Sequence, residues 1–168
     1  MERHDDSLEQ TLENWRQGRA SLDQIRKLAG ELGDRPIAAG IPVLVQLLDH
    51  EDAIVRYHAV MSLGFDLKHK PATNRLLTML ADDPDADVRD VAAGALKILW
   101  QNTKDRRVLS ALAEAALNDP DEDVRSSAFE ALIIVNGVSK EEHLRMLTGG
   151  KLPVDPVRVK AILTQTSP

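Results

Sequence analysis

The sequence contains no cysteine, few aromatic residues and no long apolar run. Without cysteine the chain has no disulfide scaffold, no thiolate metal site and no cysteine nucleophile, and a reducing cytoplasm is the expected location. The charged start over residues 1–6 precedes no apolar run of signal-peptide length, and no stretch approaches the roughly 20 apolar residues of a membrane helix. The sequence therefore predicts a cytoplasmic chain that does not bind membranes.

Charge and aromatic content narrow the possible partners and the kind of core. The formal net charge of −6 argues against binding along a nucleic acid backbone, which generally needs clustered lysine and arginine, and it equally disfavours an anionic membrane surface. Aromatic residues make up only 3% of the 168 residues although 43% are hydrophobic, so alanine, leucine and valine must fill the interior. This composition favours closely packed helices.

A Val-Arg pair recurs along the chain, and its arginines are 33, 36 and 33 residues apart, within the range of two-helix repeats. An alanine follows each arginine by three residues, and a leucine follows the first three by seven. Residues at these spacings share one face of a helix, so valine, alanine and leucine are predicted to form its packing face. The pairs and the alanines are Val55-Arg56, Val88-Arg89, Val124-Arg125, Val157-Arg158, Ala59, Ala92, Ala128 and Ala161.

Helix starts and a second helix can be placed in each unit. Asp52, Asp85 and Asp121 lie four residues before an arginine, where their side chains can cap the first turn of the following helix. Apolar segments over 41–48, 76–80 and 108–117 predict the preceding helices. Towards the N-terminus, 7–17 and 21–32 predict two more, the second with Ser21 and Gln24 in capping-box spacing. Each unit therefore is predicted to be helix, tight turn, helix.

The segments Asp83-Pro84-Asp85-Ala86-Asp87-Val88-Arg89 and Asp119-Pro120-Asp121-Glu122-Asp123-Val124-Arg125 resemble the inter-helix signature of HEAT repeats, especially the short bacterial, phycobilisome-lyase-like variety. The resemblance covers roughly residues 36–165. It implies an all-α fold, a right-handed α-solenoid of the ARM/HEAT type with about five antiparallel helix pairs. It also implies a ladder of bonds between successive repeats, with Asp83, Arg89, Asp119 and Arg125 as members. His50 and Leu152 depart from the aspartate of this pattern.

We expect a single domain over 1–168, because no linker or low-complexity segment interrupts the repeats. Its units are an N-terminal helical cap over 1–35, repeats over 36–70, 71–104 and 105–137, and a degenerate C-terminal repeat over 138–168. Degenerate end units are expected physically, since a terminal repeat has solvent on one side and must cap the apolar stack.

Motifs for catalysis, metal binding or cofactor binding are not found. Asp119, Asp121, Asp123 and Glu130 have the spacing of a calcium loop, but Val124 stands where that loop needs glycine. These aspartates are better explained as helix caps. The five histidines lack metal-ligand spacing, and neither a GxSxG motif nor a glycine-rich phosphate loop occurs. We therefore expect no catalytic residue, no metal and no cofactor.

The remaining candidates for function lie on the surface. In the first full repeat Tyr57, Met61 and Phe65 are predicted to project away from the packing face, and stacking places Asp90 and Glu130 at equivalent positions. In the last unit the equivalent positions are Val159 and Leu163, so the groove is predicted to be apolar at its ends and acidic between them. The alternative, that the cap covers Tyr57 and Met61 or that Phe65 fills the space between repeats, stays open.

Three hypotheses for function follow. The first is a non-catalytic interaction adaptor that binds a helical or extended, basic or amphipathic segment of another protein, with no nucleic acid or membrane partner. The second, from the resemblance, is a lyase or isomerase subunit similar to phycobilin lyases, which attach a bilin to a protein cysteine. The third is an immunity protein or antitoxin that covers a basic toxin.

Overall fold

The computed structural model describes residues 5–35, 40–139, 141–142, 145–146 and 152–165, and all regular structure within them is helical. The α-helices are α1 (Asp5–Arg16), α2 (Leu22–Asp34), α3 (Gly40–Leu47), α4 (Ala53–Met61), α5 (Thr73–Asp82), α6 (Ala86–Trp100), α7 (Arg106–Asn118), α8 (Glu122–Asn136) and α10 (Pro156–Gln165). A π-helix, η1 (Ser62–Asp66), and a 3-10 helix, η2 (Lys70–Ala72), connect α4 to α5.

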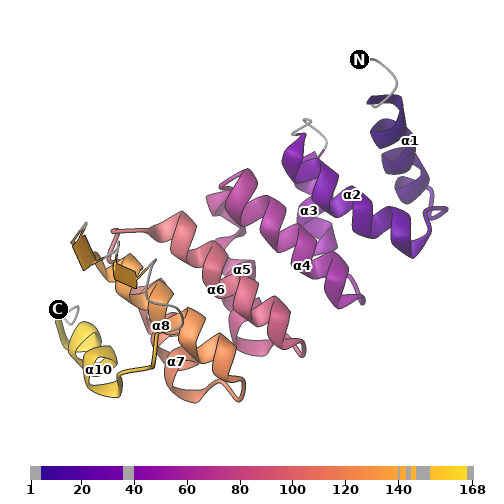
Figure 1. The fold of residues 1–168 in the computed structure, drawn as a ribbon. Helices are drawn as coiled ribbons and strands as arrows, with labels where there is room; N and C mark the ends of the chain where they lie inside the picture. The colour runs from indigo at the N-terminus through magenta and orange to yellow at the C-terminus, as the bar shows by residue number, and fades with distance from the viewer. Residues whose placement is uncertain (1–4, 36–39, 140, 143–144, 147–151, 166–168) are drawn as a thin grey trace.

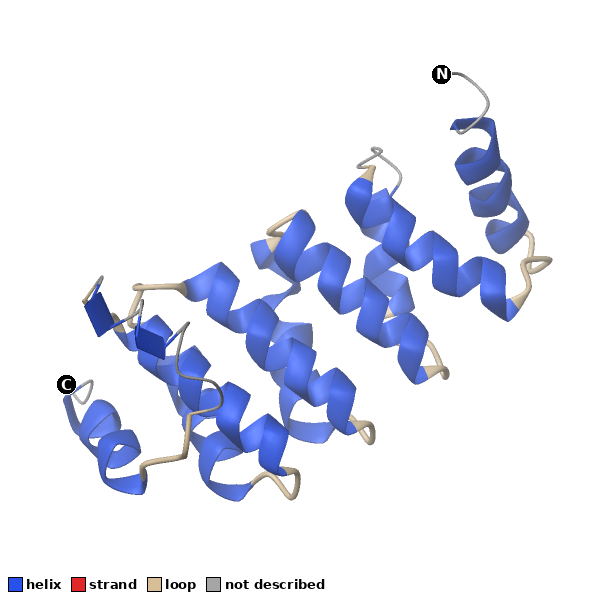
Figure 2. Cartoon of the chain, viewed as in Figure 1, coloured by secondary structure: helices blue, strands red, loops and turns tan. Residues whose placement is uncertain are grey.

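The helices stack as an elongated array with the two termini at opposite ends (Figure 1). Helices α2, α4, α6 and α8 lie side by side in one layer, and α3, α5 and α7 form a second layer behind them (Figure 2). The main contacts of each helix are with its pair partner and with adjacent units, as in a solenoid. The predicted all-α solenoid is confirmed.

Neighbouring helices of the α2–α4–α6–α8 layer are in closer contact with one another than α3, α5 and α7 are. The α2–α4–α6–α8 layer is called the second-helix face below.

The predicted helix starts are confirmed by hydrogen bonds. The side chains of Asp52, Asp85 and Asp121 accept from the backbone N–H of the residue three positions later. In each case that residue is the valine of a Val-Arg pair, so the cap and the pair belong to the same first turn. The capping box of Ser21 and Gln24 is also formed.

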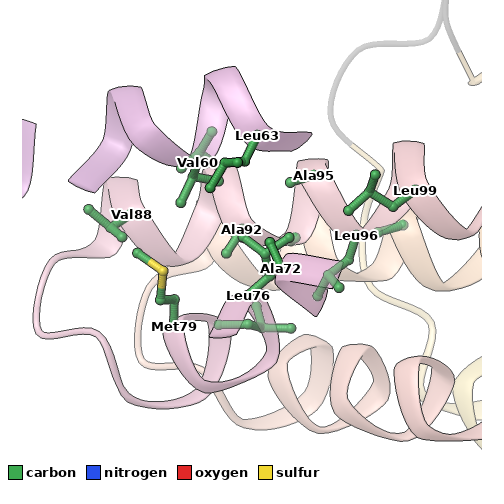
Figure 3. Close-up of a cluster of buried hydrophobic side chains, with 14 of the residues drawn as sticks. Val60, Leu63, Ala72, Leu76, Met79, Val88, Ala92, Ala95, Leu96 and Leu99 are labelled. Atoms are coloured by element: carbon green, nitrogen blue, oxygen red, sulfur yellow. The ribbon is translucent and has the colours of Figure 1, made fainter. Parts of the chain in front are cut away.

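The predicted packing face forms the core of the three full repeats. The valines of the first three pairs, with the alanine and leucine that follow each, are fully buried. Figure 3 shows how side chains of successive helices meet in this core, among them Leu63 on η1, Leu76 on α5 and Leu96 on α6. The fully buried valines, alanines and leucines of the repeated pattern are Val55, Ala59, Leu63, Val88, Ala92, Leu96, Val124, Ala128 and Leu132.

The same expectation is wrong for the last unit. Val157 is 77% exposed and Ala161 is exposed too, whereas Val159 and Ile162 are buried. Helix α10 packs against α7 as well as α8, so it does not continue the second-helix face as α6 and α8 do. Within the described residues no further unit covers the Val157 side, and α10 instead turns its other apolar residues towards the stack.

Two glycines allow the second helices to approach closely. A Cβ atom at Gly64 would overlap the Cβ of Ala95 on α6, and one at Gly33 would overlap the side chain of Ser62. Ser62 itself is buried and donates a hydrogen bond from Oγ to the carbonyl of Ala29 at 2.7 Å. Hence small residues at these crossings set the spacing between the cap and the first two repeats.

Replacing Gly64 by alanine is expected to destabilise the protein by about 1–3 kcal/mol, because the new methyl group would push α6 away from η1. Gly30→Ala is the matched control: its Cβ would lie 4.0 Å from the nearest atom, His58 Nδ1. Alanine there should stabilise helix α2 by about 0.5–1 kcal/mol. Urea unfolding measures both, and equal effects of the two variants would contradict the close contact at Gly64.

Candidate protein-binding surface

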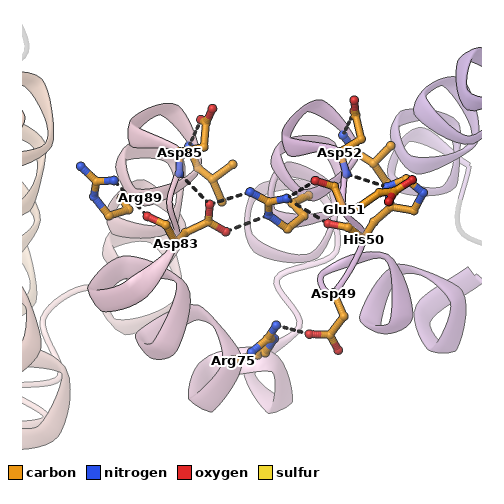
Figure 4. A network of polar contacts seen from close by, with 11 residues as sticks. Asp49, His50, Glu51, Asp52, Arg75, Asp83, Asp85 and Arg89 are labelled. Atoms are coloured by element: carbon orange, nitrogen blue, oxygen red, sulfur yellow. Dashed lines mark hydrogen bonds and ion pairs between the residues drawn. The ribbon is translucent and has the colours of Figure 1, made fainter.

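Three arginines of the second-helix face each bind an aspartate of the following unit through two parallel hydrogen bonds. Figure 4 shows the middle one of these pairs, at the turn that precedes α6. Two-point binding of a carboxylate by the guanidinium group fixes both distance and orientation. The Nε and Nη2 distances are 3.1 and 2.7 Å for Arg26–Asp52, 2.8 and 2.7 Å for Arg56–Asp83, and 2.8 and 2.9 Å for Arg89–Asp119.

The remaining nitrogen of the guanidinium holds the turn before its own helix. Arg56 Nη1 donates to the carbonyls of His50 and Glu51, both at 2.9 Å, and Arg89 Nη1 donates to the carbonyl of Asp83 at 2.9 Å. Arg56 and Arg89 are only 8% exposed. Each arginine therefore links its own turn to the next repeat in a nearly dry environment, which keeps adjacent repeats in a fixed orientation.

Of the residues predicted for the ladder, Asp83, Arg89 and Asp119 lie in these pairs. Arg125 is held in the same way at its own turn, with Nη1 donating to the carbonyls of Asp119 at 2.8 Å and Pro120 at 3.1 Å. Within the described ranges Arg125 forms no ion pair with a carboxylate.

Sequence reasoning missed the pair of Arg26 with Asp52. His50 occupies the ladder position, and its Nδ1 accepts from the backbone N–H of Asp52 at 3.0 Å, much as Asp83 Oδ1 accepts from Asp85 N–H. His50 thus keeps the turn, and Asp52 takes over the binding of arginine while still capping α4. The sequence signal for this pair is Ile25-Arg26, which together with Ala29 has the same spacing as a Val-Arg pair and its alanine. The Arg26 hydrogen bond lowers the pKa of Asp52 to about 2.

Tyr57 lies at a cavity of about 290 Å³ between α4 and α6 on the second-helix face. One wall is largely apolar and includes Ile54, whose side chain is 48% exposed, together with His58, whose ring meets the Tyr57 ring edge-on. The other wall is acidic and consists of Asp85 and the exposed Asp87. This cavity combines an apolar contact with negative charge.

The other two apolar residues predicted for the groove in the first full repeat do not line this cavity. Met61 and Phe65 are half-buried and pack against the core. The Phe65 ring covers Gly94 of α6, since a Cβ there would lie 2.9 Å from Cζ. Glu130 forms an ion pair with Lys97 at 3.0 Å across α6 and α8. Of the five predicted residues, Tyr57 is the one that lines this cavity.

Asp90, one turn beyond Asp87 on α6, has an unsatisfied carboxylate. Its Oδ1 is buried and has no hydrogen-bond partner. Burial raises the pKa of Asp90, a hydrogen bond with Ser127 opposes this, and the charges of Asp123, Asp87 and Asp121 raise it further. Ionised Asp90 is therefore unfavourable in the folded chain.

The described part of the chain contains neither a metal-ligand cluster nor a membrane-spanning helix. Among the described residues no group of three or more histidine, aspartate or glutamate side chains could hold a metal ion. In the stretch with calcium-loop spacing, Asp119 binds Arg89 and Asp121 caps α8. No described helix is long and apolar enough to cross a bilayer.

A family model described as HEAT repeats matches residues 25–97 and 41–133, which together cover more than half of the chain. The chain belongs to the HEAT-repeat family. No curated protein matches the sequence. The phycobilisome-lyase-like subtype stays a prediction. As HEAT repeats, the stacked pairs offer the extended curved surface with which such arrays generally bind other proteins.

Breaking a buried rung of this HEAT array should be costly. In Arg56→Met the Asp83 carboxylate loses its partner while it remains buried, and we expect a loss of about 3–5 kcal/mol of unfolding free energy. The matched control is Arg75→Met, which removes an exposed ion pair with Asp49 and should cost about 0–1 kcal/mol. Chemical denaturation distinguishes the two, and similar losses would show that the buried rung has no special weight.

Asp90→Asn is expected to stabilise the HEAT array at neutral pH. Because the pKa of Asp90 is raised in the folded state, its ionised form carries a penalty that develops as pH rises above the unfolded value. At pH 3, where the carboxyl is neutral in both states, the advantage of the variant should disappear. Melting temperatures at both pH values test this; an advantage that is independent of pH would show that charge is not its cause.

Proposed function

We propose that the chain is a non-catalytic protein-binding module that captures a basic, helical or extended segment of another protein on its second-helix face. The observation that carries this proposal is the cavity between α4 and α6, where an apolar wall with Ile54 and Tyr57 faces the acidic wall of Asp85 and Asp87. An apolar side chain next to a lysine or arginine would match both walls.

The scaffold suits this use because the contacts that hold it together are made by residues that do not line the cavity. Arg56 and Asp83 join the two repeats at their turns, and the apolar core is buried between the helix layers. Side chains such as Ile54 can therefore vary without weakening the stack. A surface that is already ordered before binding loses less conformational entropy when the partner arrives.

Charge supports a basic partner over an acidic one. Asp87 is exposed at the cavity, and Asp85 lies on the same wall. A partner ammonium or guanidinium group close to these carboxylates would add a favourable contact. A basic toxin covered by an antitoxin would use the same chemistry, so that alternative differs only in the identity of the partner.

Site-specific photo-crosslinking in the native cell tests the proposal. A photoreactive amino acid in place of Ile54 should form an adduct with a specific protein, and the same group in place of Val45, which is 40% exposed on α3 in the other layer, should not. The Ile54 adduct should fall about tenfold when Tyr57→Asp and Met61→Glu are introduced, provided that circular dichroism remains helical. Adducts from Val45 alone, or unchanged adducts in the double variant, would refute this surface.

A further inference from the structure

Arg125 on α8 presents a guanidinium group that is held like those of Arg56 and Arg89 but has no carboxylate bound among the described residues. Its Nη1 is fixed by the carbonyls of the two residues that begin its own turn, Asp119 and Pro120. Arg56 is 8% exposed because Asp83 covers its other side, whereas Arg125 is half-buried. The group is therefore positioned in advance for a partner that the described part of the neighbouring unit does not supply.

The arginine lies at an open cleft of about 340 Å³ at the C-terminal end of the array. Leu152 stands at the ladder position of the last unit, so this position supplies an apolar side chain in place of a carboxylate. Ser126 Oγ donates to the Leu152 carbonyl at 3.0 Å and holds this segment beside α8. The cleft thus combines one cation with an apolar wall, and its lining consists of Glu122, Arg125, Ser126, Leu152, Pro153 and Val154.

Glu122, which lines the cleft, and Asp155, at the start of α10, are considered as partners of Arg125 from this end of the array. Glu122 lines the cleft, but no ion pair joins it to Arg125 in the described part of the chain. Asp155 uses its Oδ1 to cap α10, accepting from the N–H groups of Val157 at 2.9 Å and Arg158 at 3.1 Å. Neither carboxylate takes the place that Asp83 and Asp119 have in the inner rungs.

We propose that Arg125 and this cleft form a docking site for an aspartate of a partner protein, carried on a helix-start turn of the Asp-Pro-Asp kind. The molecule contains two examples of the complex: Asp83 on Arg56 and Asp119 on Arg89. In both, Oδ1 also accepts from the N–H two residues later, which aims the carboxylate at the guanidinium group. An external turn of this kind would complete a further rung.

This site goes beyond the proposed function and does not depend on it. It lies at the end of the array, away from the cavity at Tyr57, and it recognises a carboxylate in place of a basic group. A partner that contacts only one of the two surfaces leaves the other proposal untouched.

The test uses the full chain labelled with ¹⁵N and a synthetic peptide with the sequence of residues 81–90, acetylated at its N-terminus and amidated at its C-terminus. NMR follows the arginine Nε–H signals, and the Arg125 signal is expected to move on titration. A peptide with asparagine in place of the aspartate that corresponds to Asp83 should bind about tenfold more weakly or worse, because a charged two-point contact is lost.

Protein variants give the matching comparison. Arg125→Lys keeps the charge but loses the planar, two-point geometry, so the affinity for the peptide should fall severalfold to about tenfold. Arg106→Lys, at the exposed start of α7, should leave the affinity unchanged. Both variants keep a basic residue at the altered position, which limits the effect on folding.

Several results would overturn the proposal. They are the absence of an Arg125 shift at millimolar peptide, equal affinity for the aspartate and asparagine peptides, and full affinity in Arg125→Lys. Movement of the Arg125 signal in Asp155→Asn without peptide would show that the chain's own acid occupies the site. Binding that appears only with a free peptide C-terminus would assign the cleft to chain ends.

Discussion

The contact between the guanidinium group of an arginine and the carboxylate of the next unit is the interaction on which the structure depends. The Arg56–Asp83 and Arg89–Asp119 pairs are nearly dry. Arg56 joins its own turn through two carbonyls, the next turn through Asp83, and the helix that carries it. Buried ion pairs add little stability by themselves, but they tolerate few alternative arrangements. Their role here is to fix how one repeat is oriented on the next.

The scaffold and the candidate binding surface are formed by different residues. Residues that recur, such as Val88 and Arg89, are buried in the core or bound in the ladder, whereas residues that break the repeat, such as Tyr57, lie at the cavity of the second-helix face. Asp90 shows the cost of this arrangement, since its unpaired carboxylate oxygen makes the unbound chain less stable than it could be.

The parts of the fold that follow from local chemistry could be predicted from the sequence, and the parts that follow from packing could not. The packing face that follows each Val-Arg pair and the caps at Asp85 and Asp121 depend on neighbours along one helix, so they could be predicted from the sequence alone. The rotation of α10, which exposes Val157, depends on which helices it meets. The position of Phe65 likewise could not be predicted. Phe65 lies in the π-helix η1, where the direction of each side chain differs from that in a continued α-helix, and its ring packs over Gly94.

The rungs of the ladder lie at the turns that connect the two helices of a repeat, along one edge of the array, and Figure 4 shows one of them at Asp83. The apolar core and the close crossing of Gly64 with Ala95 hold the second helices beyond these turns as well. The distance from one second helix to the next is therefore set before any partner binds, and the side chains of a bound segment have to match that repeat distance.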